Sequence, residues 1–391
     1  MSLYDNRYYH LNKTFLSILG QWPFQSRLEG NAFLAITLFF TCSLTAIELW
    51  GLIAGISDIN IFMQNAAPLL VNSLVFVKLF NSIYNKYKMK ALLENIEQTW
   101  KAINIGPESD ILRNYAEQSR SLTIKYAFFL YFGWIFYSMM PFFIKGIYLF
   151  LPTNETYEIK YIFRVEHVID VDKHLHILML HAVVSVFFIV SIPVAVDGIF
   201  ILYIQHTLAL IEIIRYNLKR IQSSKIVILE PDIADDEAYH VLIRCIKSYN
   251  RVLQLIFRSF IIYLRNMQFL LLGNIMISLS FSAAEALMMK NQFDELLRMV
   301  GSNVAQLTHV FSLSLLCQKL TDYSSGLQEA VYNCNWYEIS LRSRQLLRFT
   351  LMRTLKPCQI KAGKLHVMSL QNFGSILRIS VSYFTMLTSV Q

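Results

Sequence analysis

Long apolar stretches alternate with charged segments along the whole chain. A helix that crosses a bilayer needs about 20 consecutive, mostly apolar residues. Seven stretches meet this requirement: Asn31–Gly55, Ile61–Ile83, Leu122–Phe150, Ile177–Ile204, Ser259–Met289, Val300–Leu316 and Leu365–Val390. The sixth stretch is the shortest and the seventh is the most polar. The pattern therefore predicts an all-α membrane protein with seven transmembrane helices.

The charged segments predict how these spans are oriented. Lysine and arginine gather in the N-terminal arm, after the second and fourth spans, and before the seventh. The alternate loops are poorer in basic residues, and the loop after the third span is net acidic. Because basic loops stay on the cytoplasmic side, we expect a cytoplasmic N-terminus and an extracellular C-terminus. Asn154, in the sequence Asn-Glu-Thr, is then a candidate glycosylation site on an outer loop.

Helical periodicity continues outside the spans. Apolar residues recur at helical spacing in Gln205–Gln222, Ala238–Arg258 and Gln318–Leu355. We expect residues 205–258 and 318–364 to form a helical cytoplasmic anchor, which leads into the last span at 365–390. The sequence has no internal repeat, low-complexity run or Gly/Ser/Pro-rich linker. Residues 1–391 are therefore predicted to form a single domain.

Composition narrows the functional classes. The 391 residues are 55% hydrophobic and 16% charged, with a mean hydropathy of +0.41, whereas soluble domains are about one quarter charged. The net charge of +8 is spread over the loops, which favours basic cytoplasmic segments over nucleic-acid binding. The five cysteines form no CxxC pair, which argues against a zinc site or a disulfide framework.

Catalytic and cofactor motifs are missing from the sequence. It contains no HExxH, no Gly-rich phosphate loop and no nucleophile elbow. We therefore expect no enzyme activity, no cofactor and no metal. Carboxylates near or inside spans, such as Asp197 and Glu285, are better explained as polar networks or permeation groups. The residues before Asn31 lack the pattern of a cleaved signal peptide, so the first span is expected to direct insertion.

The C-terminal part of the chain carries a recognisable pattern. It contains VYNCNWYEIS, then LRSRQLLRFTLMRTLKP, then IKAGKLHVMSLQNFGSILRISVSYFTMLTS. These segments resemble the C-terminal pattern of the insect odorant receptor family through Tyr332, Trp336, Tyr337, Pro357, Ala362, Gly363, Phe373, Ser382, Tyr383 and Phe384. The short loop after the fourth span resembles that of a tuning, odorant-selective subunit and not the longer loop of the co-receptor.

The resemblance implies a mechanism as well as a fold. Members of this family form tetrameric, odorant-gated, non-selective cation channels in the plasma membrane of olfactory sensory neurons. A tuning subunit assembles with the co-receptor, the last helix of each subunit lines the pore, and a small volatile odorant binds among the outer halves of several spans. We therefore expect an odorant, the co-receptor and membrane lipid as partners, and no nucleic acid.

One face of the last span fits a pore lining. The residues that share this face, at a spacing of three or four, are Ser375, Ile379, Ser382, Met386 and Val390. The resemblance implies that Met386 and Val390 form an apolar gate, with Ser389 near the outer mouth. The competing interpretation is a packing helix whose hydroxyls bond to its own carbonyls. Arg378 lies about 100° from Ile379 on a helix, so we expect it off the pore face.

A site for small apolar odorants should be concave, largely apolar and aromatic. The outer halves of spans 2, 3, 4 and 6 supply the candidates, which are Leu70, Ser73, Leu74, Trp134, Tyr137, Ser138, His181, Ser185, Phe188, Val304 and Thr308. Trp134 and Tyr137 are the strongest, because their polar edges need a partner when buried. Ordinary helix packing competes with ligand contact for each residue, and His181 is better explained as an interfacial histidine than as a proton switch.

Three other functional classes compete with this interpretation. A gustatory-type chemoreceptor channel is disfavoured by the C-terminal pattern. A secondary transporter would show repeats and interrupted spans near mid-membrane, and the sequence shows neither. A G-protein-coupled receptor is disfavoured by the predicted orientation and by missing Asp-Arg-Tyr and Asn-Pro-x-x-Tyr motifs. Two structural expectations complete the prediction: Gly363 breaks the chain before the last span, and Trp336 and Tyr337 pack in the core of the anchor.

Overall fold

The computed structural model describes residues 3–57, 59–103, 105–150, 161, 171–221, 230–256, 273–280, 293–362 and 366–389. Most of the predicted fifth span lies outside these ranges. So do Asn154, Glu285, Gly363 and Val390.

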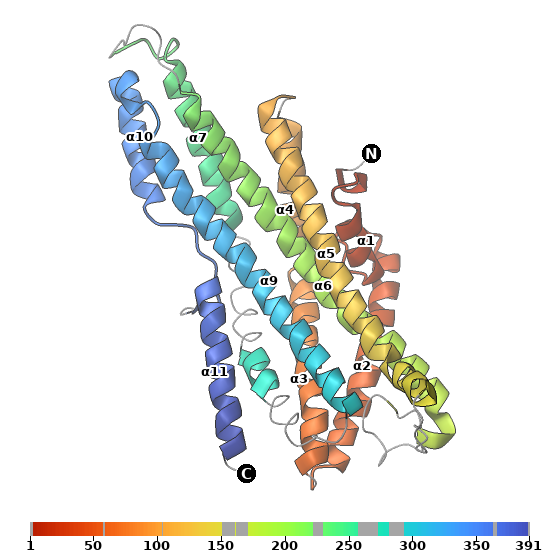
Figure 1. Ribbon diagram of the computed structural model, residues 1–391. Coiled ribbons are helices and arrows are strands. Elements are labelled where there is room, and N and C mark those ends of the chain that lie inside the picture. The colour runs from red at the N-terminus through yellow and green to blue at the C-terminus, as the bar shows by residue number, and fades with distance from the viewer. Residues whose placement is uncertain are drawn as a thin grey trace.

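The described chain is a bundle of long helices (Figure 1). Its first half comprises η1 (Leu3–Asp5), α1 (His10–Ile18), α2 (Arg27–Ala54), α3 (Ile59–Tyr84), α4 (Lys86–Ala102), α5 (Pro107–Phe150) and α6 (Val171–Lys219). The second half comprises α7 (Glu237–Gln254), α9 (Phe293–Tyr332), η3 (Trp336–Glu338), α10 (Leu341–Thr354), β1 (Lys361–Ala362), β2 (His366–Val367) and α11 (Leu370–Ser389). Residues 273–280 are also helical.

Several predicted spans coincide with observed helices. Three helices are long and apolar enough to cross a membrane within the described ranges, namely α2, α5 up to Tyr148, and α6 from Lys173. The part of α3 from Pro68 to Tyr84 is a shorter apolar helix. Helix α6 runs on to Lys219, as the periodicity after the fourth span predicts. Helix α5 begins at Pro107, earlier than the predicted third span, because its polar first turns carry the helix out of the apolar region.

The anchor differs from the prediction in two respects. The predicted helix over Gln318–Leu355 is divided into the end of α9, the short η3 and α10. The hydroxyl of Ser340 starts α10 by accepting a hydrogen bond from the backbone N–H of Ser343, at 3.2 Å. Trp336 and Tyr337 are half exposed and contact each other edge to face with centroids 5.9 Å apart, so the expectation that they fill the anchor core is wrong for this chain.

A small strand pair precedes the last helix and is an exception to the all-helical expectation. β1 and β2 are antiparallel, with Lys361 opposite Val367 and Ala362 opposite His366. The pair connects α10, at the anchor end of the bundle, to α11, which descends along one side of it (Figure 1). The predicted break at Gly363 lies between these two strands in the sequence but outside the described residues.

Helix α6 is the centre of the core. Nearly every residue from Ile192 to Ile214 is buried, because α6 packs against α1, α2, α3, α5, α7 and α9. A helix that is apolar around its whole circumference is stable only when neighbours cover every side. The remaining helices are therefore positioned by their contacts with α6.

The N-terminal arm is fixed to this core by specific hydrogen bonds. The Tyr4 hydroxyl donates to the Leu93 carbonyl at 2.6 Å, and the Asn12 amide donates to the Gly198 carbonyl at 3.3 Å. The chain then turns at Gly20, where φ is +69°. A Cβ atom at this position would lie 2.1 Å from the Gly30 carbonyl oxygen, so only glycine allows the turn to pack against the start of α2.

Candidate functional site

An aromatic layer joins α5, α6 and α2 in the region predicted to bind odorants. The Trp134 ring meets Phe187 edge to face at 5.3 Å, and Phe187 meets Phe188 at 5.6 Å. Phe188 stacks on Phe40 of α2 with centroids 5.3 Å apart and planes 8° apart. The indole N–H of Trp134 donates to the Val183 carbonyl at 3.0 Å. The polar edge of Trp134 is thus satisfied within the fold, which leaves its ring face for packing.

His181 lies at the junction of α2 and α6. Its Nε2 is 2.8 Å from the Ser43 hydroxyl of α2 and 3.5 Å from the Ser185 hydroxyl one turn away. Its ring lies 6.0 Å from that of Phe40. These contacts are those of an interfacial histidine, as the sequence predicts. The signal that Phe40 and Ser43 belong to this layer is absent from the sequence, because it depends on how α2 is rotated.

A buried polar group lies beside this layer. Glu48 of α2 is almost fully buried and accepts a hydrogen bond from the Asn72 amide of α3. Tyr161 is buried and interacts electrostatically with Glu48 and with Tyr137 of α5. Ser138, next to Tyr137, is fully buried, and its hydroxyl has no hydrogen-bond partner among the described residues. This hydroxyl is a polar group in an apolar region that a ligand could satisfy.

The candidates on α3 and α9 are placed differently. Ser73 is exposed, donates to the Leu70 carbonyl at 2.7 Å and accepts from Asn274 in the helical segment 273–280. Leu74 is buried in the core. Val304 is half exposed on α9, and Thr308 lies one turn further along, where its carbonyl accepts from the Ser312 hydroxyl. Helix α3 is thus tied to segment 273–280 and to α2, with Val304 and Thr308 on a separate element.

The structure brings together only part of the predicted ligand set. Trp134, His181, Ser185 and Phe188 belong to one aromatic layer, and Tyr137 and Ser138 lie on the same helix as Trp134. Ser73 and Leu70 share a hydrogen bond. Among the described residues, no interaction joins Val304 or Thr308 to the other candidates. None of the eleven candidates lines either of the two cavities described below.

A buried charged network connects four helices deeper in the bundle. The Lys78 ammonium of α3 contacts both Asp197 oxygens of α6, at 2.7 and 2.6 Å. The Tyr126 hydroxyl of α5 donates to Asp197 at 2.7 Å. His309 of α9 places Nε2 3.1 Å from Lys78 and Nδ1 3.2 Å from Asp197. We name Lys78, Tyr126, Asp197 and His309 the four-helix network.

The geometry fixes the charges in the four-helix network. An ammonium group can only donate hydrogen bonds, so Nε2 of His309 accepts from Lys78. The imidazole proton is then assigned to Nδ1, which lies 3.0 Å from the Tyr126 hydroxyl oxygen and 3.2 Å from Asp197. The result is one buried cation, one buried anion and a neutral histidine, with each charge held by hydrogen bonds. Asp197 thus belongs to a polar network, which is one of the two roles that the sequence suggests for it. The sequence does not predict its partners.

The last helix packs on its neighbours by one face only. Ile376 and Ser380 are buried, Phe373 contacts Phe311 of α9 at 5.6 Å, and the Ser280 hydroxyl donates to the Ser380 carbonyl at 3.5 Å. An adjacent face carries the predicted pore residues. Along this face, Ile379 and Ser382 are exposed and Met386 is 62% exposed.

The hydroxyls of α11 bond to their own helix. Ser375 donates to the Gln371 carbonyl at 3.3 Å, and Ser382 donates to the Arg378 carbonyl at 2.9 Å. This is the pattern of the competing packing interpretation, but it leaves the oxygen lone pairs of both hydroxyls free to accept. Arg378 is exposed and has no ion pair with any described residue. The exposed face therefore combines apolar side chains with outward acceptor oxygens.

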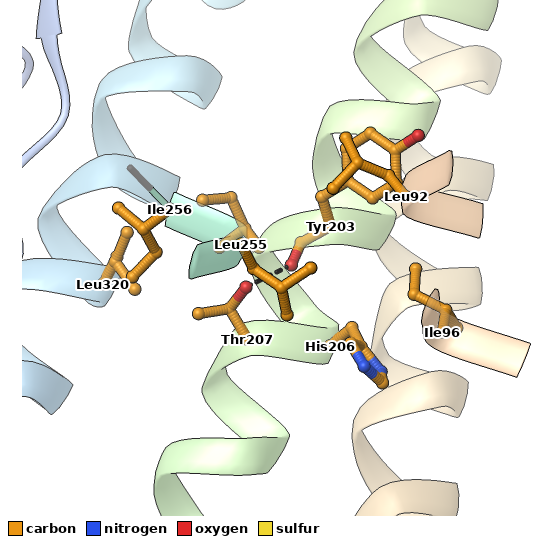
Figure 2. A pocket seen from close by; sticks show the side chains of 9 residues that line it. Leu92, Ile96, Tyr203, His206, Thr207, Leu255, Ile256 and Leu320 are labelled. Atoms are coloured by element: carbon orange, nitrogen blue, oxygen red, sulfur yellow. Dashed lines mark hydrogen bonds between the residues drawn. The ribbon is translucent and has the colours of Figure 1, made fainter. Parts of the chain in front are cut away.

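A cavity lies where α6 passes α4, α7 and α9 (Figure 2). Tyr203, His206 and Thr207 of α6 line it together with Ile96 of α4 and Leu320 of α9. The Thr207 hydroxyl donates to the Tyr203 carbonyl at 2.8 Å. His206 is buried, and neither of its ring nitrogens has a hydrogen-bond partner among the described residues. The cavity lies on the predicted cytoplasmic side, away from the aromatic layer.

The cysteines form no bridge. All five are free, and Cys245, Cys317, Cys334 and Cys358 are buried while Cys42 is exposed on α2. The described residues contain no group of three or more His, Cys, Asp or Glu side chains that could hold a metal ion.

Comparisons with known proteins agree with the fold. The chain is similar to odorant receptor Or2 of Anopheles gambiae, with 28% identity over 149 residues that cover 37% of this chain and 38% of Or2. It is 36% identical to odorant receptor 2a of Drosophila melanogaster over 78 residues, or 20% of each chain. It is 30% identical to the odorant receptor coreceptor of Aedes aegypti over 95 residues, which cover 24% of this chain and 20% of the coreceptor. The alignments thus span well under half of each relative.

The structural similarity extends over the whole chain. The insect olfactory receptor OR5 from Machilis hrabei in complex with eugenol matches with a TM-score of 0.75 at 16% identity, covering 99% of this chain and 100% of OR5. This likeness shows a shared fold. The family model described as 7tm Odorant receptor matches residues 58–381, which include α3 through most of α11. The chain belongs to the 7tm odorant receptor family.

Proposed function

We propose that this chain is an odorant-sensing subunit of a ligand-gated, non-selective cation channel. The observation that carries the proposal is the family match over residues 58–381, because it includes the candidate ligand region, the anchor and most of the last helix. The curated relatives include odorant receptors and an odorant receptor coreceptor. The chain would act in the plasma membrane of an olfactory sensory neuron, assembled with a co-receptor.

The exposed face of α11 supports a pore role. Its apolar residues would face lipid or a partner in a simple packing helix, but Ser375 and Ser382 interrupt the apolar surface with acceptor oxygens. A pore needs such a mixture, since polar groups keep the lumen wet and an apolar ring closes it by dewetting. Met386 and Val390 are proposed as the gate, and Ser389 as a residue of the outer mouth.

The aromatic layer supports an odorant site between α5, α6 and α2. A small volatile molecule with an aromatic ring and one polar group, such as the eugenol bound by OR5, suits aromatic faces with a few hydrogen-bonding groups. Ser138 offers a buried hydroxyl without a described partner, next to Tyr137. The remaining candidates on α3 and α9 would line the rest of the proposed odorant site.

A physical connection leads from this region towards the pore. His309 of the four-helix network and Phe311, which contacts Phe373 of α11, lie two positions apart on α9. A shift of α9 caused by a ligand would therefore reach both the network and the pore helix. The ligand opens the channel only if it binds the open arrangement more tightly than the closed one.

Whole-cell recording tests the proposal. Cells that express the co-receptor with and without this chain are exposed to a panel of volatile aromatic compounds. We expect cation currents that require this chain and that are abolished when it is omitted. Solute uptake without current, or identical currents without the chain, would overturn the proposal.

A further inference from the structure

A basic cleft lies where the turn before α2 meets the start of α4. Ser26, Arg27 and Gly30 line one side, and Lys86, Tyr87 and Lys90 line the other. The cleft has a volume of about 320 Å³ and is open to solvent. Three cationic side chains and no carboxylate line the cleft, which is an unusual charge balance for a surface that is otherwise mixed.

The three cations are poorly neutralised by the protein. The Lys86 ammonium donates to the Gly20 carbonyl at 3.1 Å and forms no ion pair with a described residue. Burial lowers its pKa, with no compensating carboxylate. Arg27 also lacks an ion pair within the described ranges. The Lys90 ammonium nitrogen lies 3.9 Å from a carboxylate oxygen of Glu94, and the side chains of Lys90 and Glu94 are both half exposed. Such an exposed pair is worth little, so no described carboxylate pairs firmly with the cations of the cleft.

The backbone adds to this positive potential. Helix α2 begins at Arg27, and the Ser26 hydroxyl accepts only the N–H of Glu29, at 3.3 Å. The first N–H groups of a helix favour an anion when they remain unpaired. Gly30, one turn further, lines the cleft without adding a side chain, and a Cβ there would make only ordinary contact with the Lys86 ammonium nitrogen, at 3.8 Å.

The cleft sits at the level where a membrane surface is expected. Helix α2 contains a stretch apolar enough to cross a membrane, its predicted span begins at Asn31 beside the cleft, and α3 ends at Tyr84, two residues before Lys86. The surrounding side chains are exposed and apolar or aromatic, with Leu28 85% and Tyr84 78% exposed. Aromatic and basic residues together are typical of the interface between lipid headgroups and acyl chains.

We propose that this cleft binds the phosphate group of an anionic phospholipid, with Arg27, Lys86 and Lys90 as its cationic contacts. The acyl chains of the lipid run along the exposed apolar side of α2, past Leu28. The same phosphate chemistry is present in soluble anions, but only a lipid also uses the apolar surface beside the cleft. Basic pockets beside membrane helices recognise anionic headgroups in this way.

Native mass spectrometry of the full chain in detergent tests the proposal with defined lipids. Phosphatidylinositol 4-phosphate is expected to bind in preference to phosphatidylcholine. The double variant Arg27→Gln/Lys90→Gln keeps the hydrogen bond from Lys86 to Gly20, and its affinity for the anionic lipid should fall by roughly tenfold. Lys86→Gln should weaken binding further if the chain still elutes as a folded species, and Lys90→Gln alone provides a milder test.

The matched control is Lys88→Gln/Lys101→Gln, which removes two positive charges from α4 outside the cleft. Its affinity should stay within about twofold of the parent chain. Equal losses in the two double variants, or equal binding of both lipids, would overturn the proposal. Inorganic phosphate and glycerol phosphate are added as soluble competitors of the lipid. Displacement of the lipid by either one at equal concentration would assign the cleft to soluble anions and reject the lipid.

Discussion

Helices α6 and α11 show two different ways of using an apolar helix. Helix α6 is buried on every side from Ile192 to Ile214, whereas α11 packs by one face and leaves Ile379 and Met386 exposed. The interactions of α6 are completed within one chain, so its position is fixed by the fold. The described residues leave much of the exposed face of α11 uncovered, and in the proposed assembly this face would meet neighbouring subunits.

The largest effect should come from the four-helix network on α6. Replacing Asp197 by Asn leaves the Lys78 cation buried without its anion, which costs about 3–5 kcal/mol. We expect a sharp fall in folded, surface-expressed protein and in the thermal unfolding temperature of the purified chain. The double variant Lys78→Met/Asp197→Leu should recover much of this loss, because it removes both charges. Wild-type stability of Asp197→Asn would show that α6 is not fixed by this network.

A pair of substitutions within α11 compares its two faces directly. Ile376→Ala creates a cavity against α9 and should lower the free energy of unfolding by about 2 kcal/mol or more. Met386→Ala lies on the exposed face, so it should change stability by less than about 0.5 kcal/mol while raising basal current or altering permeation. Thermal unfolding and whole-cell recording measure the two effects. Equal loss of stability in both variants would place Met386 in a packed interface and not in a gate.

The aromatic layer should respond more weakly. Trp134→Phe removes the hydrogen bond to the Val183 carbonyl while keeping most of the ring, at a cost of about 1 kcal/mol. We expect a shift of a few-fold in the odorant concentration for half-maximal current, with little change in maximal current. Phe128→Leu, on the exposed side of the same helix, is the matched control. A response unchanged by Trp134→Phe would remove this side chain from the ligand region.

The smallest effect concerns the thiols of the anchor. Burial raises the pKa of Cys334 to about 11 and that of Cys245 to about 12. Since only the thiolate reacts with maleimide, labelling at pH 8 should be very slow and should increase as the pH rises towards these values. A cysteine introduced by Lys101→Cys, whose side chain is 73% exposed, should react rapidly under the same conditions. Fast labelling of Cys245 at pH 8 would mean that the anchor opens readily, unlike the α6 core.

The sequence predicts long apolar elements well, because length and hydropathy are local properties. The C-terminal end of α2 and the extension of α6 to Lys219 follow from residues that are adjacent in the chain, whereas α2 begins at Arg27, four residues before the predicted start of the span. The break between α9, which ends at Tyr332, and α10, which begins after the N-cap Ser340, was not predicted, because apolar residues recur at helical spacing across it and a single capping contact starts α10. The exposure of Trp336 and Tyr337 was missed for a related reason, since periodicity does not reveal which helix faces are covered.

The candidate site was predicted less completely than the fold. Trp134, His181 and Phe188 do lie in one layer, but their neighbour Phe40 depends on the rotation of α2. The four-helix network joins residues up to 231 positions apart, beyond any local pattern. A signal was nevertheless present: Lys78 and Asp197 are single charges of opposite sign inside apolar stretches, where each needs a partner. Pairing such charges across spans would have predicted the contact between α3 and α6.

The contact between Gly20 and Gly30 has a practical consequence for tagging the receptor. The backbone of Gly20 packs directly against that of Gly30, so the arm from Tyr4 to Gly20 is held tightly against α2, α4 and α6. A fusion partner attached ahead of Leu3 would leave these contacts of the arm in place. A deletion that removes the arm would remove the side-chain donors to the Leu93 and Gly198 carbonyls, so the arm is a poor place to shorten the chain.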